Sequence, residues 1–94
     1  MQIKFEESAS KGSFFVEENG QRLAEMTFSK AGDTTLIIDH TEVSDVLRGK
    51  NVGKQLVAFA VDYARKNNLK IIPLCPFTKS VIDKTPEYQD VLKK

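Results

Sequence analysis

The chain has 94 residues, of which 40% are hydrophobic and 29% charged, enough for one ordinary globular domain with a small core. Fourteen lysines and arginines against thirteen aspartates and glutamates give a net charge of +1, which argues against a general nucleic-acid-binding surface. A single cysteine excludes an intramolecular disulfide, and no segment resembles a signal core or a membrane span of about 20 apolar residues. We therefore expect one cytoplasmic domain over residues 1–94, without nucleic-acid or membrane partners.

Four segments in the first half of the chain have the patterns of strands. Gln2–Glu6 alternates polar and apolar residues, as a half-buried strand does. Ser13–Glu18 and Gln21–Ser29 follow, and Thr34–Val43 is rich in β-branched residues around an apolar centre. That centre predicts a strand buried on both faces. Together the segments predict a meander of three or four antiparallel strands.

Asn19-Gly20 separates two of these strands and predicts a tight hairpin, because both residues tolerate a positive φ. In the register of such a hairpin Glu17 lies opposite Arg22. The two side chains are then expected to form a favourable pair of opposite charges.

The second half of the chain predicts a crossover unit. Leu69–Cys75 is a short apolar strand, and Val52–Asn67 has an apolar stripe at helical spacing, formed by Val52, Leu56, Phe59, Ala60, Tyr63 and Ala64. A strand, helix and strand in this order place the two strands parallel. Thr78–Lys84 predicts one or two helical turns, and Thr85-Pro86-Glu87 starts a further helix. The predicted fold is α/β (α+β): an antiparallel meander, a β-α-β crossover and short C-terminal helices around a mixed sheet.

The loop before the predicted helix has the residue types of a phosphate-binding loop. The N–H groups of a first helical turn and the helix macrodipole attract phosphate. Gly49 and Gly53 allow a close approach of the backbone, and Arg48, Lys50 and Lys54 add positive charge. A solvated basic loop that only starts a helix explains these residue types equally well.

The segment Arg48–Leu56 resembles the pyrophosphate-binding motif of the GNAT acetyltransferase superfamily, Gln/Arg-x-x-Gly-x-Gly/Ala. Arg48 and Gly53 match the motif. Asn51 stands where the motif has its middle glycine, and asparagine is the next-best residue for a positive φ.

Three further segments extend this resemblance over nearly the whole chain, which is similar to the small YjdJ-type GNAT-like family. They are His40–Val43, Pro73–Phe77 and Pro86–Tyr88. The resemblance implies a minimal GNAT-like domain that binds acetyl-coenzyme A and transfers the acetyl group to an amine. The acceptor would be a small molecule or a protein, and the chain a monomer or a weak dimer.

The resemblance also implies where the cofactor binds. The N–H groups of Lys50–Lys54 would hold the pyrophosphate, and the strand end at Glu42–Val43 would pair with the pantetheine amides. Pro73 and Pro76 lack an N–H, so the two parallel strands would splay to admit pantetheine. An edge strand with prolines that block aggregation is the alternative. The expected cofactor-binding residues are Val43, Arg48, Gly49, Lys50, Asn51, Val52, Gly53, Lys54, Pro76 and Phe77.

Three residues are candidates for the chemistry of acetyl transfer. Glu42, at the end of the strand, would be the general base, and His40 on the same strand face could relay a proton. Cys75 would lie near the thioester, where it takes up the acetyl group or contacts the cofactor sulfur. A strand-end carboxylate in solvent, a buried histidine and a small buried thiol are the structural alternatives. By the same resemblance, Tyr88 would take the place of the tyrosine with which larger members protonate the leaving thiolate, although the helix that carries it there is truncated in this chain.

Two hypotheses without catalysis stay open. The chain could hold coenzyme A without turnover, or Arg48–Lys54 could contact an acidic protein partner. One histidine and one cysteine, far apart in sequence, predict no metal site.

Overall fold

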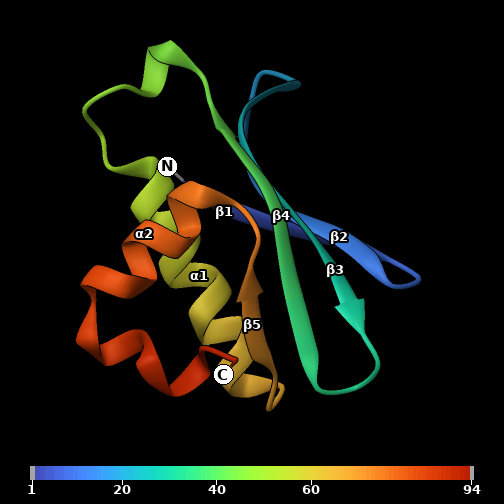
Figure 1. Cartoon of the computed structure of the whole chain (residues 1–94). Coiled ribbons are helices and arrows are strands. Elements are labelled where there is room, and N and C mark those ends of the chain that lie inside the picture. The colour runs from blue at the N-terminus through green and yellow to red at the C-terminus, as the bar shows by residue number, and fades with distance from the viewer. Residues whose placement is uncertain (1, 94) are drawn as a thin grey trace.

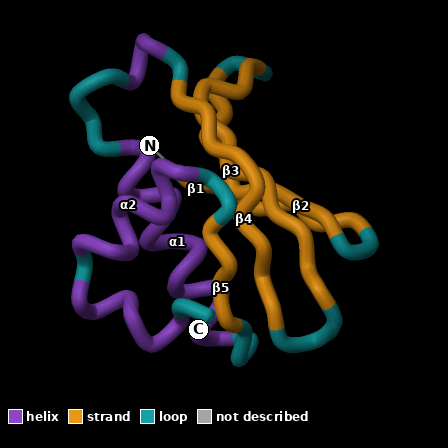
Figure 2. The backbone as a smooth tube through the Cα atoms, viewed as in Figure 1, coloured by secondary structure: helices purple, strands orange, loops and turns teal. Residues whose placement is uncertain are grey.

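In the computed structural model, which describes residues 2–93, five strands form one mixed sheet with the helices gathered on one side of it (Figure 1 and Figure 2). The strands are β1 (Ile3–Ser8), β2 (Lys11–Glu18), β3 (Gln21–Ala31), β4 (Thr35–Val43) and β5 (Lys70–Pro73). The helices are α1 (Val52–Lys66) and α2 (Pro76–Lys84), with short 3₁₀ helices η1 (Asp45–Leu47) and η2 (Pro86–Val91). Strands pair in the order β1-β2-β3-β4-β5, antiparallel except for β4 with β5. The predicted mixed fold is confirmed.

The hairpin between β2 and β3 has the predicted turn. Asn19 and Gly20 have φ values of 53° and 78°, the left-handed conformations that such a turn requires. Glu17 and Arg22 face each other in the ladder, but the register shifts beside this pair. Glu17 instead pairs with Lys4 at 3.6 Å, and Arg22 contacts two other carboxylates. The register was predicted correctly, and the predicted ion pair was wrong.

An irregularity divides β4 into two parts. Asp39 faces no residue of β3, because Thr27 pairs with His40 and Phe28 with Ile38. Before Asp39 the strand is largely buried under the helices, whereas the residues after it are half-buried or exposed. The expectation that the whole strand is buried on both faces is therefore wrong for its second half. The extra residue also changes which side chains of β4 face the helices.

The two parallel strands separate after Ile38. β5 pairs with β4 only over Thr35–Ile38, and the amides of Leu74 and Cys75 both donate to the Ile38 carbonyl, at 3.0 and 3.2 Å. β4 continues to Val43 while the chain after β5 turns into α2. The splay that the prolines predicted is confirmed, although β5 is shorter than expected and is also the edge strand of the sheet.

The core lies between the sheet and α1. Six residues of α1 are buried: Val52, Leu56, Val57, Ala60, Val61 and Ala64. Phe59 and Tyr63, on the predicted stripe, are half-buried and pack against Phe14, with ring centroids 5.4 and 5.6 Å apart. Burying a side chain of this size contributes about 1.5–3 kcal/mol, so these contacts fix α1 against the hairpin.

The ends of the helices follow the sequence in most places. α1 ends at Lys66, and Asn68 has the left-handed φ of 56° expected after a helix. α2 starts at Pro76, two residues before the predicted helix. The last predicted helix is a 3₁₀ helix, and the Thr85 hydroxyl donates to the Val81 carbonyl rather than capping it. No helix within residues 2–93 combines the length and apolar character that crossing a membrane requires.

Candidate functional site

A groove of about 450 Å³ opens between the end of β4, the loop that follows it and the first turn of α1, with Phe77 of α2 on its other side. We call it the β4–α1 groove. Its lining residues are Thr41, Val43, Leu47, Arg48, Gly49, Asn51, Val52, Gly53, Lys54 and Phe77. Eight of the ten expected cofactor-binding residues thus line one cavity. Lys50 and Pro76 do not.

The first turn of α1 presents unpaired backbone N–H groups to this groove. The Lys50 amide donates to the Leu47 carbonyl at 3.2 Å, and the Gln55 amide makes the first helical bond, to the Asn51 carbonyl at 3.0 Å. Between them, no residue within 2–93 accepts a hydrogen bond from the amides of Asn51–Lys54, and the Asn51 side chain makes no cap. Four donors at a helix N-terminus form a ready anion site. The expectation that the Lys50 amide belongs to this set is wrong.

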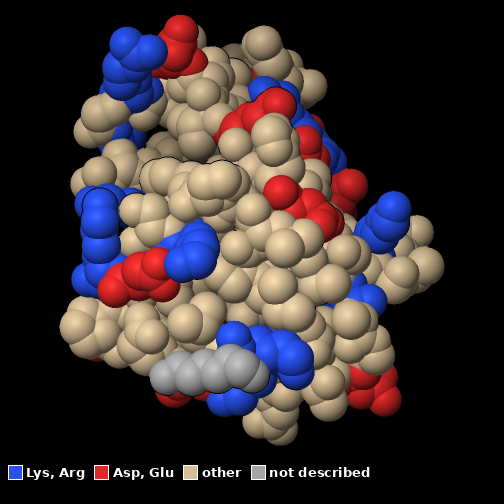
Figure 3. Space-filling view, viewed as in Figure 1, with Lys and Arg blue, Asp and Glu red and all other residues tan. Residues whose placement is uncertain are grey.

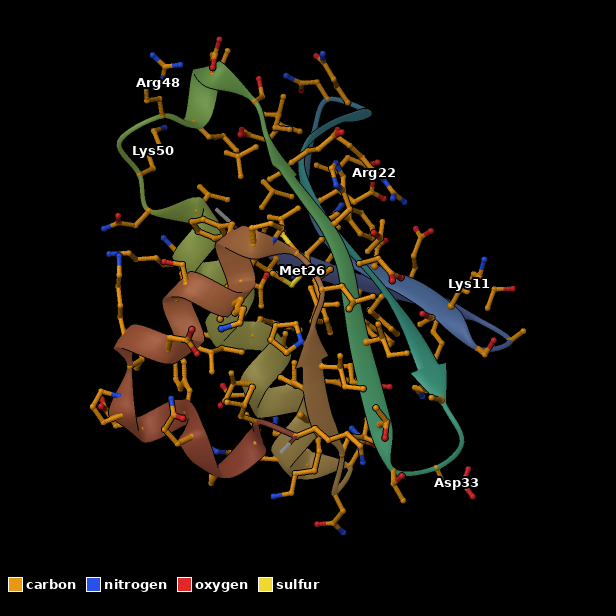
Figure 4. The ribbon with its side chains drawn as sticks, viewed as in Figure 1. Lys11, Arg22, Met26, Asp33, Arg48 and Lys50 are labelled. Atoms are coloured by element: carbon orange, nitrogen blue, oxygen red, sulfur yellow. The ribbon has the colours of Figure 1, made fainter. Side chains whose placement is uncertain are left out.

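The loop reaches this geometry through two residues with left-handed backbones. Gly49 has a φ of 83° and Asn51 a φ of 56°, so asparagine takes the conformation expected at the middle position of the motif. The Arg48 guanidinium pairs with Asp45 at 2.9 Å and is largely exposed. Figure 4 shows Arg48 and Lys50 along the loop that leads into α1.

Phe77 packs over Gly53. A Cβ added at Gly53 would lie 2.7 Å from the Phe77 Cζ, closer than any real contact. Phe77 is 42% exposed and stands in the first turn of α2, where Pro76 occupies the first position. Sequence reasoning assigned Gly53 to the approach of an anion and missed this second reason for a glycine.

Three small polar side chains converge beside the groove where β4 and β5 separate. The Cys75 thiol donates to the Thr41 hydroxyl at 3.4 Å, and the Thr41 and Thr78 hydroxyls are 3.5 Å apart. Cys75 is 5% exposed and does not line the groove, whereas Thr41 does. Burial raises the pKa of the thiol. Hydrogen bonds that Thr41, Thr78 and the Phe77 amide donate to the thiolate form outweigh it and hold the pKa below its ordinary value.

Sequence reasoning missed Thr41 and Thr78. The irregularity at Asp39 turns Thr41 toward the helices, and nothing in the residue pattern of the strand marks that position. Thr78 is fully buried on α2, and only the fold brings it to β4.

His40 and Glu42 share one face of β4, as predicted, with His40 Nε2 and Glu42 Oε1 3.0 Å apart. Their side chains are 65% and 75% exposed, so His40 is not the buried histidine of the structural alternative. Neither residue lines the β4–α1 groove, although Val43, which follows Glu42, does.

Tyr88 lies away from the groove. It belongs to η2, where the Glu87 carbonyl accepts a hydrogen bond from Arg65 near the end of α1. The groove lies at the start of α1, about 20 Å away along a helix of this length. Within residues 2–93, no three histidine, cysteine, aspartate or glutamate side chains are grouped so that they could hold a metal ion.

Comparison with known proteins gives three kinds of match. Residues 13–91 match the family model described as GCN5-related N-acetyl-transferase. A solution structure of a GCN5-like putative N-acetyltransferase from Staphylococcus aureus is 41% identical, with a TM-score of 0.71, over 96% of this chain and 87% of that chain. Protein NATD1 of Xenopus tropicalis is 28% identical over 85 residues, which are 89% of this chain and 78% of that protein.

A more distant solved structure shares the fold. It is that of AAC(6')-Iy in complex with the bisubstrate analog CoA-S-monomethyl-acetylneamine, with a TM-score of 0.55 and 12% identity. The match covers 93% of this chain and 65% of that chain.

Proposed function

Because the chain belongs to the GCN5-related N-acetyltransferase family, we propose that it binds acetyl-coenzyme A in the β4–α1 groove and transfers the acetyl group to an amine. The observation that carries this proposal is the set of free amides at Asn51–Lys54. They stand at the N-terminus of a helix of 15 residues, where the macrodipole favours negative charge. Arg48 and Lys54 in the lining add positive charge for a diphosphate.

The free edge of β4 suits the pantetheine arm. Ser44 donates its amide to the Leu23 carbonyl of β3 at 2.7 Å. Because backbone N–H groups alternate along a strand, the amides of Thr41 and Val43 then point the other way, into the gap that β5 leaves. These groups can pair with the amides of pantetheine. The Val43 N–H is our candidate for the donor that stabilises negative charge on the thioester oxygen.

We assign the uptake of the proton of the acceptor ammonium to Glu42 and His40, which form an exposed hydrogen-bonded pair. Once this proton is lost, the free amine forms the new bond to the acetyl carbon and the carbon–sulfur bond breaks. A second proton from the nitrogen goes to the leaving thiolate, so coenzyme A departs as the free thiol. Glu42 accepts the proton directly or through His40, to which it is hydrogen-bonded. The pair lies on the outer face of β4, so the amine approaches from that face while the thioester lies in the gap beside the strand.

Cys75 lies behind Thr41 at the point where the strands diverge. Its lowered pKa and its place suit either of two roles, transient uptake of the acetyl group or contact with the sulfur of the cofactor. Intact mass after incubation with acetyl-coenzyme A separates them. An acetyl adduct that forms in the wild type and is missing in Cys75→Ala indicates a covalent role. A wild type that forms no adduct indicates direct transfer.

Calorimetry and thiol release test the proposal in two steps. We expect acetyl-coenzyme A and coenzyme A both to bind with one site per chain. Release of free thiol should then require an added amine and fall by about 10²-fold or more in Glu42→Gln, with unchanged cofactor affinity. Glu18→Gln, an exposed substitution beside the hairpin turn, is the matched control.

Each alternative has its own outcome. Absence of cofactor binding would leave the loop as a contact for an acidic partner. Binding of coenzyme A with no thiol release for any amine would leave a cofactor-binding protein without turnover.

A further inference from the structure

A second hollow, of about 480 Å³, adjoins the β4–α1 groove. It lies where the start of β3 runs beside the end of β4, and Val43 lines both cavities. Its lining residues are Arg22, Leu23, Ala24, Glu25, Glu42, Val43 and Ser44. We call it the β3–β4 surface. Glu42, the expected general base, is thus part of this hollow rather than of the groove.

The two cavities have opposite charge. Glu25 and Glu42 are direct partners in the β3–β4 ladder, and Glu6 reaches Arg22 from β1. Within the lining, the two carboxylates of Glu25 and Glu42 against the guanidinium of Arg22 leave the β3–β4 surface negative. Lys54 and Arg48, which is paired with Asp45, make the groove positive. In Figure 3 acidic side chains lie over the upper parts of β3 and β4 with basic ones among them, and basic side chains flank the loop before α1, with acidic atoms beside them at its top.

Arg22 is a fixed part of this surface. Its guanidinium lies 3.8 Å from the centroid of the Phe15 ring and donates to Glu6, Glu25 and Ser13. These contacts engage its donors with the protein itself, so the lining residues within 2–93 offer no free cation to an anionic occupant. Glu42, whose partner is the exposed His40, keeps acceptor capacity for an incoming cation.

The hollow is too open to enclose a small amine. Sites for small molecules bury about 70–90% of the ligand surface, but the side chain of Glu42, which lines this hollow, is 75% exposed. Val46, which follows the lining residue Ser44 by two positions, is 67% exposed, and its amide donates to the Ser44 hydroxyl. An extended chain that crosses the strand ends would bury Val43 and Val46 together, which a small amine cannot do.

We propose that the acceptor is a lysine side chain of a basic protein segment that lies across the β3–β4 surface. This inference rests on the proposed acetyl transfer and names its substrate class. The reacting lysine reaches Glu42 and the thioester at Val43. A neighbouring arginine or lysine pairs with Glu25, and an apolar neighbour covers Val46.

Peptides of equal length test this assignment in the full chain loaded with coenzyme A or acetyl-coenzyme A. In one peptide arginines and a leucine flank the lysine, and in the other glutamates and a leucine flank it. A simple alkylamine serves as the small acceptor. Fluorescence anisotropy measures peptide binding, and thiol release with peptide mass measures transfer. Glu25→Lys is the informative variant and Glu18→Gln the control, with circular dichroism to verify folding.

We expect the basic peptide to bind and to be acetylated, with affinity that falls as salt rises. Glu25→Lys should weaken its binding and raise its KM at least about tenfold, which is about 1.4 kcal/mol, without changing cofactor affinity. Equal binding of basic and acidic peptides, an unaffected Glu25→Lys, or a higher kcat/KM for the alkylamine would each overturn the assignment. Binding of the basic peptide without thiol release would overturn the acetyl transfer but keep the docking surface.

Discussion

At the scale of single residues, the Phe77 ring leaves no room for a Cβ at Gly53. Alanine is favoured over glycine in a helix by about 1 kcal/mol, but a methyl group at Gly53 meets the Phe77 ring. We therefore expect Gly53→Ala to leave stability nearly unchanged in the wild type and to raise it by up to about 1 kcal/mol in the Phe77→Ala background. Urea unfolding of the four proteins measures this coupling. Equal stabilisation in both backgrounds would show that the ring does not lie over Gly53.

Thr41 sets the ionisation of Cys75. Thr41→Val keeps the shape of the side chain but removes the hydroxyl, so we expect the pKa of Cys75 to rise. Thr27→Val is the matched control, because it removes a β3 hydroxyl that donates to the His40 carbonyl at 3.5 Å rather than to Cys75. Ultraviolet absorbance of the thiolate during a pH titration reports the pKa.

The same interaction has a consequence for stability. A thiol whose folded pKa is lowered stabilises the protein at a pH above its unfolded pKa, and this contribution is lost as pH falls through the folded pKa. The stability of the wild type relative to Thr41→Val should therefore increase as pH rises from the folded pKa of Cys75 to its unfolded pKa. A pKa that is the same in both proteins would contradict the role of Thr41.

Part of the geometry of the groove could be predicted from the sequence. Asn51 was expected to adopt a left-handed backbone because its residue type allows one, and it does. Thr41 was missed because the extra residue at Asp39 depends on pairing with β3. The Lys50 amide was misassigned because the carbonyl of Leu47 accepts it only once the η1 turn has formed.

At the scale of elements, the last 3₁₀ helix is held to α1 by one ion pair. Arg65 donates to both carboxylate oxygens of Asp90, at 2.7 and 3.0 Å, and to the Glu87 carbonyl. The hydrogen bond from Arg65 holds the pKa of Asp90 below its ordinary value. This stabilisation is present above the unfolded pKa and is lost as pH falls through the lower, folded one.

Asp90→Asn should accordingly make the stability of the chain less sensitive to acid, with the difference from wild type vanishing at a pH below the folded pKa. Urea midpoints from neutral to acidic pH measure it. Asp33→Asn, in the turn between β3 and β4 (Figure 4), is the control, since Asp33 has no ion pair within residues 2–93. If the urea midpoints of Asp90→Asn and wild type change in parallel with pH, the Arg65–Asp90 pair does not contribute to stability.

The order and type of the elements could be predicted from local sequence patterns, but the exposure of their residues could not. β4 has enough apolar and β-branched residues to look buried throughout, yet the helices cover only the part before Asp39. Val57 and Val61 of α1 lie off the predicted stripe and are buried because β5 and α2 also pack against this helix. Such coverage depends on neighbours that are distant in the sequence.

At the scale of the whole molecule, one splay between two strands brings the site together. It frees the edge of β4, exposes the first turn of α1 and joins a positive groove to a negative surface at Val43. The sequence motif indicated the positive half. The negative half requires the register of β3 against β4, which places Glu25 opposite Glu42 and depends on the irregularity at Asp39.

Amide NMR during a titration with coenzyme A tests most directly whether the helix start receives the diphosphate. The resonances of Asn51–Lys54 should shift downfield as their N–H groups gain charged acceptors, while those of Asn67 and Asn68 at the other end of α1 stay in place. Pantetheine, which lacks the diphosphate, should leave the first set unmoved. Saturation with coenzyme A that leaves the Asn51–Lys54 amides unshifted would contradict the account.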